Sequence, residues 1–190
     1  MSVHWTAHRF SGGALALDTA NTVVLRGRPE EFDRFADVEE IARFAEAASH
    51  YRSDELGGRR LAVADPAPIA STVIDIREAT DALFRRRAAS VDDRAALPRF
   101  LRACAAGLDG AVGDPRGPWA FEAALATSAL SLLASDARRL RVCRNCNWLF
   151  VDRSRNSSRL WCDMAVCGNR QKAKRHYRRH RAAAEEVSHA

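Results

Sequence analysis

The sequence predicts a mainly α-helical fold, with a helical N-terminal domain followed by a small C-terminal module made of a short β-hairpin and a helix. Three observations support this fold class. Apolar residues recur at helical spacing through much of the first two thirds of the chain. Four cysteines occur in two close pairs near the C-terminus, and positive charge is concentrated around them.

Two helices are expected in the first half of the chain, over residues 33–49 and 66–89. In each of them, apolar side chains spaced by three or four residues fall on one face. The expected buried face of the first helix comprises Phe35, Val38, Ala42, Ala45 and Ala48. That of the second comprises Ile69, Val73, Ile76, Thr80 and Leu83, with Arg85, Arg86 and Arg87 as a solvated edge.

A third helix is expected to start near Asp92 and Asp93, because acidic residues favour a helix N-terminus, and Pro98 is expected to interrupt its first turns. Residues 107–118 contain four glycines and two prolines, which predicts a loop. Residues 119–135 carry a single charge, Glu122. A helix this apolar must be surrounded by other elements, so we place it at the centre of the N-terminal domain.

The four C-terminal cysteines have the spacing C-x2-C-x15-C-x4-C and comprise Cys143, Cys146, Cys162 and Cys167. Two close pairs separated by a loop suit tetrahedral coordination of zinc, with each sulfur about 2.3 Å from the metal. Four sulfur ligands fill the coordination sphere, so the predicted cofactor is one structural Zn²⁺ ion without an open position for a reacting water.

Short strands are expected over residues 140–142 and 148–151, on either side of the first cysteine pair, and a helix is expected to begin near Gly168 or Asn169. A hairpin followed by a helix corresponds to a treble-clef-like zinc module. The expected apolar contacts of this module are Trp148, Phe150, Trp161 and Met164. Because this core is small, the module is expected to depend on the metal for its stability.

Residues 141–181 contain twelve Arg or Lys residues against two Asp residues, whereas the whole chain has a net charge of +6. The positive charge therefore belongs to one part of the chain, as in proteins that bind phosphate groups of nucleic acids. A solvated charge cluster that only aids solubility is the alternative.

The final helix has its cations on one broad side, with Ala173, His176, Tyr177 and His180 on the other side, which is expected to pack against the rest of the protein. The loop of residues 152–159 adds arginines among serines and an asparagine, which can hydrogen-bond phosphate or base edges. Its arginines could instead pair with Asp152 or Asp163. The candidate nucleic-acid contacts are Arg153, Arg155, Arg159, Arg170, Lys172, Lys174, Arg175 and Arg178.

The segment from Cys143 to Arg178, which contains Cys167-Gly168-Asn169-Arg170, resembles the CGNR zinc finger family. Leu17-Asp18-Thr19-Ala20-Asn21-Thr22 resembles the opening of the ABATE domain, which is described as a stress-induced transcription regulator and usually precedes that finger. Asn147 stands where a small residue is expected in the finger family, and Leu160 where a second basic residue is common. The resemblance implies a bacterial regulator that binds DNA. It divides the chain into an ABATE-like regulatory domain (residues 1–138), a CGNR-type finger (139–184) and a tail (185–190).

Asp18 and Asn21 are candidates for lining the pocket of a small-molecule effector, although Asp and Asn commonly hydrogen-bond local backbone groups instead. Cys104 lies in an alanine-rich stretch and is expected to be a packed side chain. The chain has no Gly-rich phosphate loop, HExxH motif or nucleophile elbow, so no catalytic residue and no enzymatic function are predicted.

The leading hypothesis is a cytoplasmic bacterial transcription regulator that binds DNA through the zinc module. A reducing compartment suits four thiols acting as metal ligands, and neither a signal-peptide pattern nor a membrane-spanning apolar stretch is expected. Formation of a homo-oligomer is compatible with the sequence. An RNA-binding module and a protein–protein adaptor that grips an acidic partner remain as alternatives.

Overall fold

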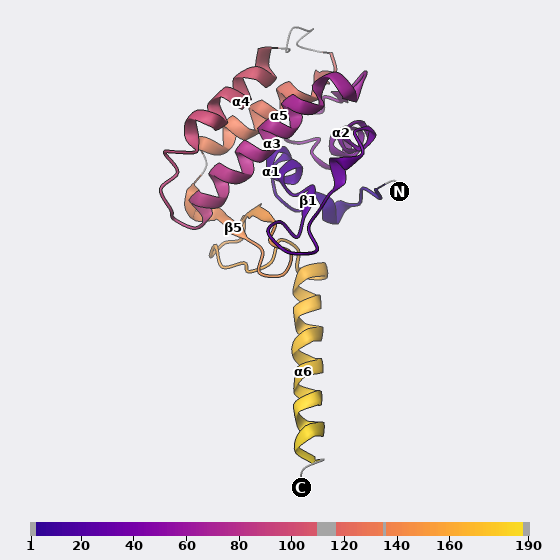
Figure 1. Ribbon diagram of the computed structural model, residues 1–190, viewed down its shortest axis with the longest axis vertical. Coiled ribbons are helices and arrows are strands. Elements are labelled where there is room, and N and C mark those ends of the chain that lie inside the picture. The colour runs from indigo at the N-terminus through magenta and orange to yellow at the C-terminus, as the bar shows by residue number, and fades with distance from the viewer. Residues whose placement is uncertain (1–2, 110–116, 135, 188–190) are drawn as a thin grey trace.

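The computed structural model describes residues 3–109, 117–134 and 136–187. Within these residues, five α-helices form the body and a sixth extends away from it (Figure 1). The helices are α1 (Leu15–Ala20), α2 (Glu39–Tyr51), α3 (Pro66–Ala88), α4 (Leu97–Asp109), α5 (Phe121–Ser131) and α6 (Asn169–Val187). Single 3-10 turns cover Ala7–Phe10, Arg34–Ala36, Leu132–Ala134 and Ala137–Arg139, and a π-helical turn covers Met164–Gly168. The predicted mainly α fold is confirmed.

The strands in the described part of the chain are short and form three separate two-stranded pairs. β1 (Val23–Val24) pairs antiparallel with β2 (Phe32–Asp33), and β3 (Leu61–Ala62) pairs parallel with β4 (Trp119–Ala120). The third pair is the predicted hairpin, in which β5 (Leu140–Val142) runs antiparallel to β6 (Leu149–Val151). Its register places Leu140 opposite Val151 and Val142 opposite Leu149.

The apolar helix α5 is buried as predicted, with Phe121 and Leu125 fully enclosed. It packs against α1, α3 and α4, which surround it (Figure 1). The approach of α4 is close, because a Cβ atom added at Gly107 would meet Ile76 Cδ1 at 2.6 Å and Glu122 O at 2.9 Å. The absence of a side chain at Gly107 therefore allows three helices to meet.

Gly107 also marks a difference from the predicted loop over residues 107–118. α4 continues through Gly107 to Asp109, and residues 110–116 lie outside the described part of the chain. At the other end, α4 begins at Leu97 and not at Asp92 or Asp93. Pro98 then occupies the first turn, where its missing N–H has no intrahelical partner to lose.

Helix α3 matches its predicted range, but α2 begins later than predicted. Residues 34–36 form a 3-10 turn in which Asp33 Oδ1 accepts a hydrogen bond from Phe35 N at 2.8 Å. This local side-chain contact competes with helix formation. The buried face of α2 is consequently made by Ile41, Phe44, Ala45 and Ala48, so Val38 and Ala42 are only half-buried.

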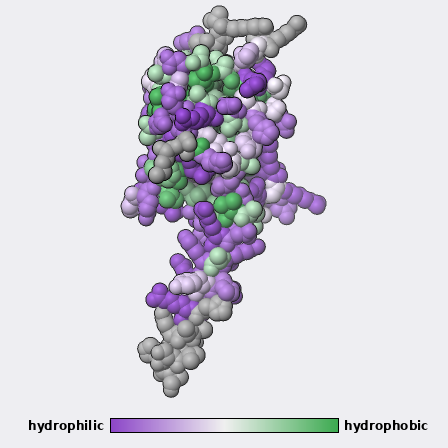
Figure 2. Space-filling model, turned by 90° about the vertical axis from the view of Figure 1, so that its right-hand side faces the viewer, coloured by the Kyte–Doolittle hydropathy of each residue, from purple (hydrophilic) through white to green (hydrophobic). Residues whose placement is uncertain are grey.

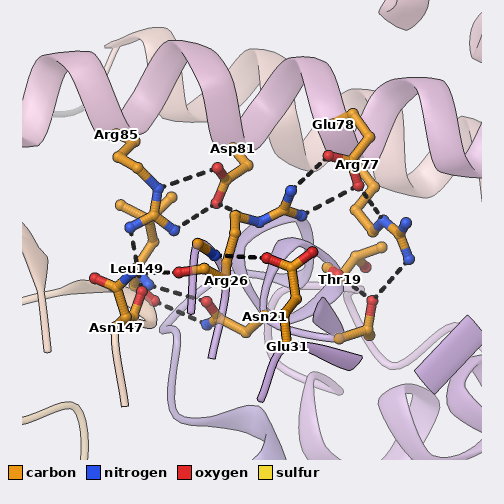
Figure 3. Close-up of polar contacts among 12 residues, drawn as sticks. Thr19, Asn21, Arg26, Glu31, Arg77, Glu78, Asp81, Arg85, Asn147 and Leu149 are labelled. Atoms are coloured by element: carbon orange, nitrogen blue, oxygen red, sulfur yellow. Dashed lines mark hydrogen bonds and ion pairs between the residues drawn. The ribbon is translucent and has the colours of Figure 1, made fainter. Parts of the chain in front are cut away.

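Charged side chains of α3 form a network that joins it to its neighbours (Figure 3). Arg26, from the segment after β1, donates to Glu78 at 2.6 and 3.1 Å and lies 3.5 Å from Asp81. Arg85 donates to Asp81 through two nitrogens and to the carbonyl oxygen of Asn147 at 3.2 Å. Arg85 is thus a half-buried contact between α3 and the hairpin, and not part of the solvated edge that the sequence predicts.

The hairpin packs directly on the helical body. Leu140 and Leu149 belong to the same hydrophobic core as α5, and Val151 N donates to Gly12 O at 2.8 Å. The predicted domain boundary after residue 138 therefore separates residues that pack together in one hydrophobic core. Among the described residues, no helix combines the length and the apolar character needed to cross a bilayer.

α6 extends from the body beside the cysteine cluster, and its described surface is hydrophilic (Figures 1 and 2). The side chains of Ala173, His176 and Tyr177 are exposed, and Tyr177 is 68% exposed. The prediction that this face packs against the protein is therefore wrong for these three residues. The side chain of His180 lies outside the described part of the structure.

Candidate metal centre and nucleic-acid interface

The four predicted cysteines converge on one point. Their Sγ atoms all lie within 4.8 Å of one another, with 3.6 Å between Cys146 and Cys162 and 3.8 Å between Cys162 and Cys167. A tetrahedral zinc ion with bonds of 2.3 Å would hold its sulfurs about 3.8 Å apart. The cluster therefore fits the metal that its spacing predicts, and its four thiol donors suit zinc.

Local backbone structure brings the first pair together. Cys143 N donates to Trp148 O at 2.8 Å, and Asn147 N donates to Cys143 O at 3.0 Å, which closes a tight turn around Cys146. Asn147 has a φ of 64°, a left-handed conformation that asparagine tolerates better than most residues. This backbone conformation explains why the finger family favours a small residue at this position. Asn147 departs from that pattern but still tolerates the conformation.

The second pair is positioned by Asp163, which lies one residue after Cys162. Its Oδ1 accepts hydrogen bonds from Ala165 N at 2.8 Å and Val166 N at 3.2 Å, so it caps the π-helical turn that carries Cys167. Its Oδ2 lies 2.9 Å from His8 Nδ1. Burial favours the neutral acid, but the hydrogen bonds from His8 and the backbone outweigh it and lower the pKa of Asp163.

Side chains next to the cysteines support the cluster. Asn145 Nδ2 donates to Cys167 Sγ at 3.4 Å, and Gln171 Nε2 from α6 donates to Asn145 Oδ1 at 2.8 Å. Such contacts orient metal ligands in other sites. Trp148 and Phe150 are buried beside the cysteines and Trp161 is half-buried, as predicted, but Met164 is 49% exposed and does not belong to this core.

Arg34 is a buried cation beside the cluster that sequence reasoning missed. It is 6% exposed, and its Cζ atom lies 5.5 Å from the ring centroid of Trp148. Burial lowers the pKa of Arg34 to about 10, nearby Arg9 adds to this effect, and Cys146 opposes it. Because zinc with four thiolates carries a net charge of about −2, a buried guanidinium at this place offsets part of that charge.

The loop that follows β6 is organised from inside by Asp152, whose side chain is buried. Asp152 accepts hydrogen bonds from Ser154 N at 2.9 Å and Arg159 N at 2.8 Å. Burial raises the pKa of this acid, but these hydrogen bonds outweigh burial and lower it. Asp152 therefore holds the loop backbone, and no ion pair links it or Asp163 to an arginine side chain of this loop in the described structure.

The predicted nucleic-acid residues are presented outward, with one exception. Arg159 is half-buried, where it donates to Cys162 O at 2.5 Å and lies over the ring of Phe150. The exposed members are Arg153, Arg155, Arg170, Lys172, Lys174, Arg175 and Arg178. Arg153 also donates to Gly13 O at 2.7 Å, which ties the loop to the N-terminal segment.

Eight of the 17 arginines that the structure describes in residues 3–139 form ion pairs with carboxylates, in contrast to this set. Ion pairs to carboxylates are formed by Arg26, Arg43, Arg52, Arg77, Arg85, Arg87, Arg94 and Arg138. Within the described part of the chain, none of the eight predicted nucleic-acid residues forms one. These eight cations therefore form a local concentration of positive charge that no described ion pair neutralises.

The two candidate effector residues are occupied by structural contacts. Asp18 is buried, where its carboxylate accepts hydrogen bonds from Gly12 N at 2.8 Å and Arg52 Nε at 2.5 Å. Asn21 donates to Leu149 O and accepts from Leu149 N, both at 2.9 Å (Figure 3). These contacts favour the structural alternative for both residues. Cys104 is 1% exposed, and burial raises the pKa of its thiol to about 11, so it is a packed side chain.

Comparison with family models gives two matches. The model described as "Putative stress-induced transcription regulator" (ABATE) matches residues 13–140, and the model of the CGNR zinc finger matches residues 139–180. Neither the curated proteins nor the solved structures gave a match. The finger match and the buried cysteine cluster together support one structural zinc ion per chain.

Proposed function

Since the chain belongs to the ABATE family, whose model is described as "Putative stress-induced transcription regulator", and carries a CGNR zinc finger, we propose that it binds duplex DNA through that finger. The four cysteines hold the zinc ion in this proposal. The loop arginines and the cations of α6 neutralise backbone phosphates.

The observation that carries the proposal is a concentration of exposed cations on the loop and the first half of α6. Arg153, Arg155, Arg170, Lys172, Lys174, Arg175 and Arg178 are exposed and form no ion pair with a described carboxylate, whereas eight arginines of the helical body do. Unpaired charge on a surface repels itself, and an anionic partner relieves this repulsion. A helix exposed on all sides over residues 172–179 also has the width to enter a major groove.

Salt dependence of binding tests the proposal. Five phosphate contacts would make log K fall with log salt with a slope of about −4 to −5. Lys174→Gln should reduce the magnitude of that slope by about one and weaken binding to all duplexes alike. Fluorescence anisotropy of zinc-loaded protein with labelled duplexes between 50 and 200 mM salt would measure both.

Arg94→Gln is the matched control. It removes the same charge at a side chain that is 86% exposed and lies before α4, so the slope should stay unchanged. The same titration with single-stranded and duplex RNA separates the alternatives. Preference for RNA would establish an RNA-binding module. Absence of binding to either nucleic acid at 50 mM salt would reject the proposal in favour of an adaptor that grips an acidic protein.

A further inference from the structure

A groove of about 690 Å³ lies between the C-terminal end of α3 and the zinc module. Its walls come from α3, from the β5–β6 hairpin and from the loop of residues 152–160. Figure 1 shows how the end of α3 approaches β5 at this place. The groove thus touches both the region matched to the regulator family and the region matched to the finger.

The groove is strongly cationic. Arg85, Arg141, Arg144 and Arg159 line it, and no Asp or Glu is found among its described lining residues. Asp81 neutralises Arg85 through two hydrogen bonds. The other three form no ion pair with any described residue, so the groove has about three uncompensated positive charges.

Two of these cations are held in place by contacts that leave their charge free. Arg141 Nη2 donates to Ser157 O at 2.8 Å, and Arg159 Nη2 donates to Cys162 O at 2.5 Å. Backbone carbonyls orient the guanidinium groups without neutralising them. A site with fixed donors needs less ordering when an anion binds, which favours affinity.

The rest of the lining suits a small organic molecule. Ala88, Val142 and Leu160 give an apolar surface, on which Leu160 is 43% exposed, and Ser157 and Ser158 are also among the lining residues. The volume falls in the range of small-molecule sites, and an apolar lining with a few polar groups is typical of them. A bare phosphate backbone would make no use of the apolar part.

We propose that this groove binds a small organic phosphate of about nucleotide size, with its phosphate groups at Arg141, Arg144 and Arg159 and its apolar part against Val142 and Leu160. The proposal stands without DNA binding, because the ligand is bound by the free protein. If DNA also uses Arg159, ligand and DNA weaken each other reciprocally, as linkage requires.

Isothermal titration of the full-length, zinc-loaded protein with ADP, inorganic pyrophosphate and adenosine tests the inference. ADP and pyrophosphate should bind, and adenosine should bind at least about tenfold more weakly than ADP, because it lacks the charges that the arginines recognise. Arg144→Gln should weaken ADP about tenfold or more, since this side chain is exposed and its loss leaves the fold intact. Leu160→Gln should weaken ADP but leave pyrophosphate unchanged.

Arg155→Gln is the control, because Arg155 is an exposed arginine of the same loop that does not line the groove. Its ADP affinity should match that of the unaltered protein. Failure of both ADP and pyrophosphate to bind at millimolar concentration would overturn the inference. An equal loss of ADP affinity in Arg144→Gln and Arg155→Gln would also overturn it. So would an Arg144→Gln variant that loses affinity for duplex DNA but keeps its affinity for ADP, because that result would assign the groove to the DNA surface.

Discussion

The Asp18 carboxylate is fully enclosed between Gly12 N and Arg52 Nε. Burial raises its pKa to about 6, even though the charge of Arg52 and the Gly12 N–H favour the carboxylate. Between about pH 4 and pH 6 the folded state therefore holds a proton that the unfolded state has released. The contribution of Asp18 to stability increases as the pH falls through this range, because a raised folded-state pKa favours protonation on folding.

The prediction is that the free energy of unfolding of the unaltered protein, minus that of Asp18→Asn, increases by about 1 to 1.5 kcal/mol from pH 7 to pH 5. Urea unfolding at intermediate pH values measures the difference, with the zinc content determined at each pH as a control. A difference that decreases toward pH 5 would mean that the Arg52 pairing dominates over burial.

At the residue scale, the sequence predicts local chemistry well and long-range partners poorly. The spacing of the four cysteines is sufficient to predict their convergence, because close pairs need only a tight turn each. The partner of Asn21 could not be predicted, since Leu149 lies far along the chain and contributes only backbone atoms. Arg34 gives no signal either, because its burial depends on aromatic rings from three separate segments.

At the scale of elements, α6 and α5 are opposite cases. α5 has its side chains enclosed by α1, α3 and α4, whereas α6 contacts the π-helical turn at its start and is exposed along residues 172–179. Helices with few tertiary contacts open at low free-energy cost, and isolated helices of this length are marginal in water.

Amide hydrogen exchange should therefore be faster in residues 172–179 than in residues 123–129 of α5, by about two orders of magnitude or more. Mass-spectrometric exchange on zinc-loaded protein measures this, and Gln171, which bonds Asn145, should mark the start of the fast region. Equal protection in the two helices would show that α6 is covered in solution, for example by a second copy of the chain.

The elements that the sequence predicted best are those with a simple pattern. α3 and α5 follow continuous helical spacing, and the hairpin strands flank the cysteine pair that forces the turn. Errors arose where side chains compete with the backbone, as at Asp33, which delays the start of α2. The packing of α6 was predicted from its narrow apolar face, but nothing in the described structure covers Ala173 or Tyr177. The prediction failed because the pattern of apolar residues on a helix does not show whether a partner is present.

At the scale of the whole molecule, the β5–β6 hairpin joins the zinc module to the core of the helical body, while the cysteines, Trp148 and Phe150 form a second, smaller cluster. Leu140 and Leu149 belong to the core of α5, and His8 pairs with Asp163 from the other end of the chain. The predicted boundary after residue 138 therefore separates two sequence families more clearly than two folding units.

Cys162→Ser should therefore destabilise the entire protein. Without zinc the hairpin loses its fixed geometry, so the core loses the support of Leu140 and Leu149. We expect the melting temperature to fall by roughly 10 °C, corresponding to about 3 to 5 kcal/mol. Far-UV circular dichroism would measure the fall, alongside metal analysis.

Cys104→Ala serves as the control, because it removes a buried thiol that takes no part in the cluster and should leave one zinc ion per chain. A Cys162→Ser protein that has lost zinc but melts at the original temperature would show that the helical body is stable without the hairpin.

The hydrogen bonds between Asn21 and Leu149 have a consequence for biosynthesis, because they join positions 128 residues apart. α1 is buried against β6 as well as α3 and α5, so this helix leaves the ribosome well before the hairpin and reaches its final contacts only after the hairpin has emerged. Closing so long a loop lowers the entropy of the chain before the native contacts form and stabilise it. The packing of α1 therefore stays incomplete until the ribosome has made the hairpin, which is also the segment that carries the first two zinc ligands.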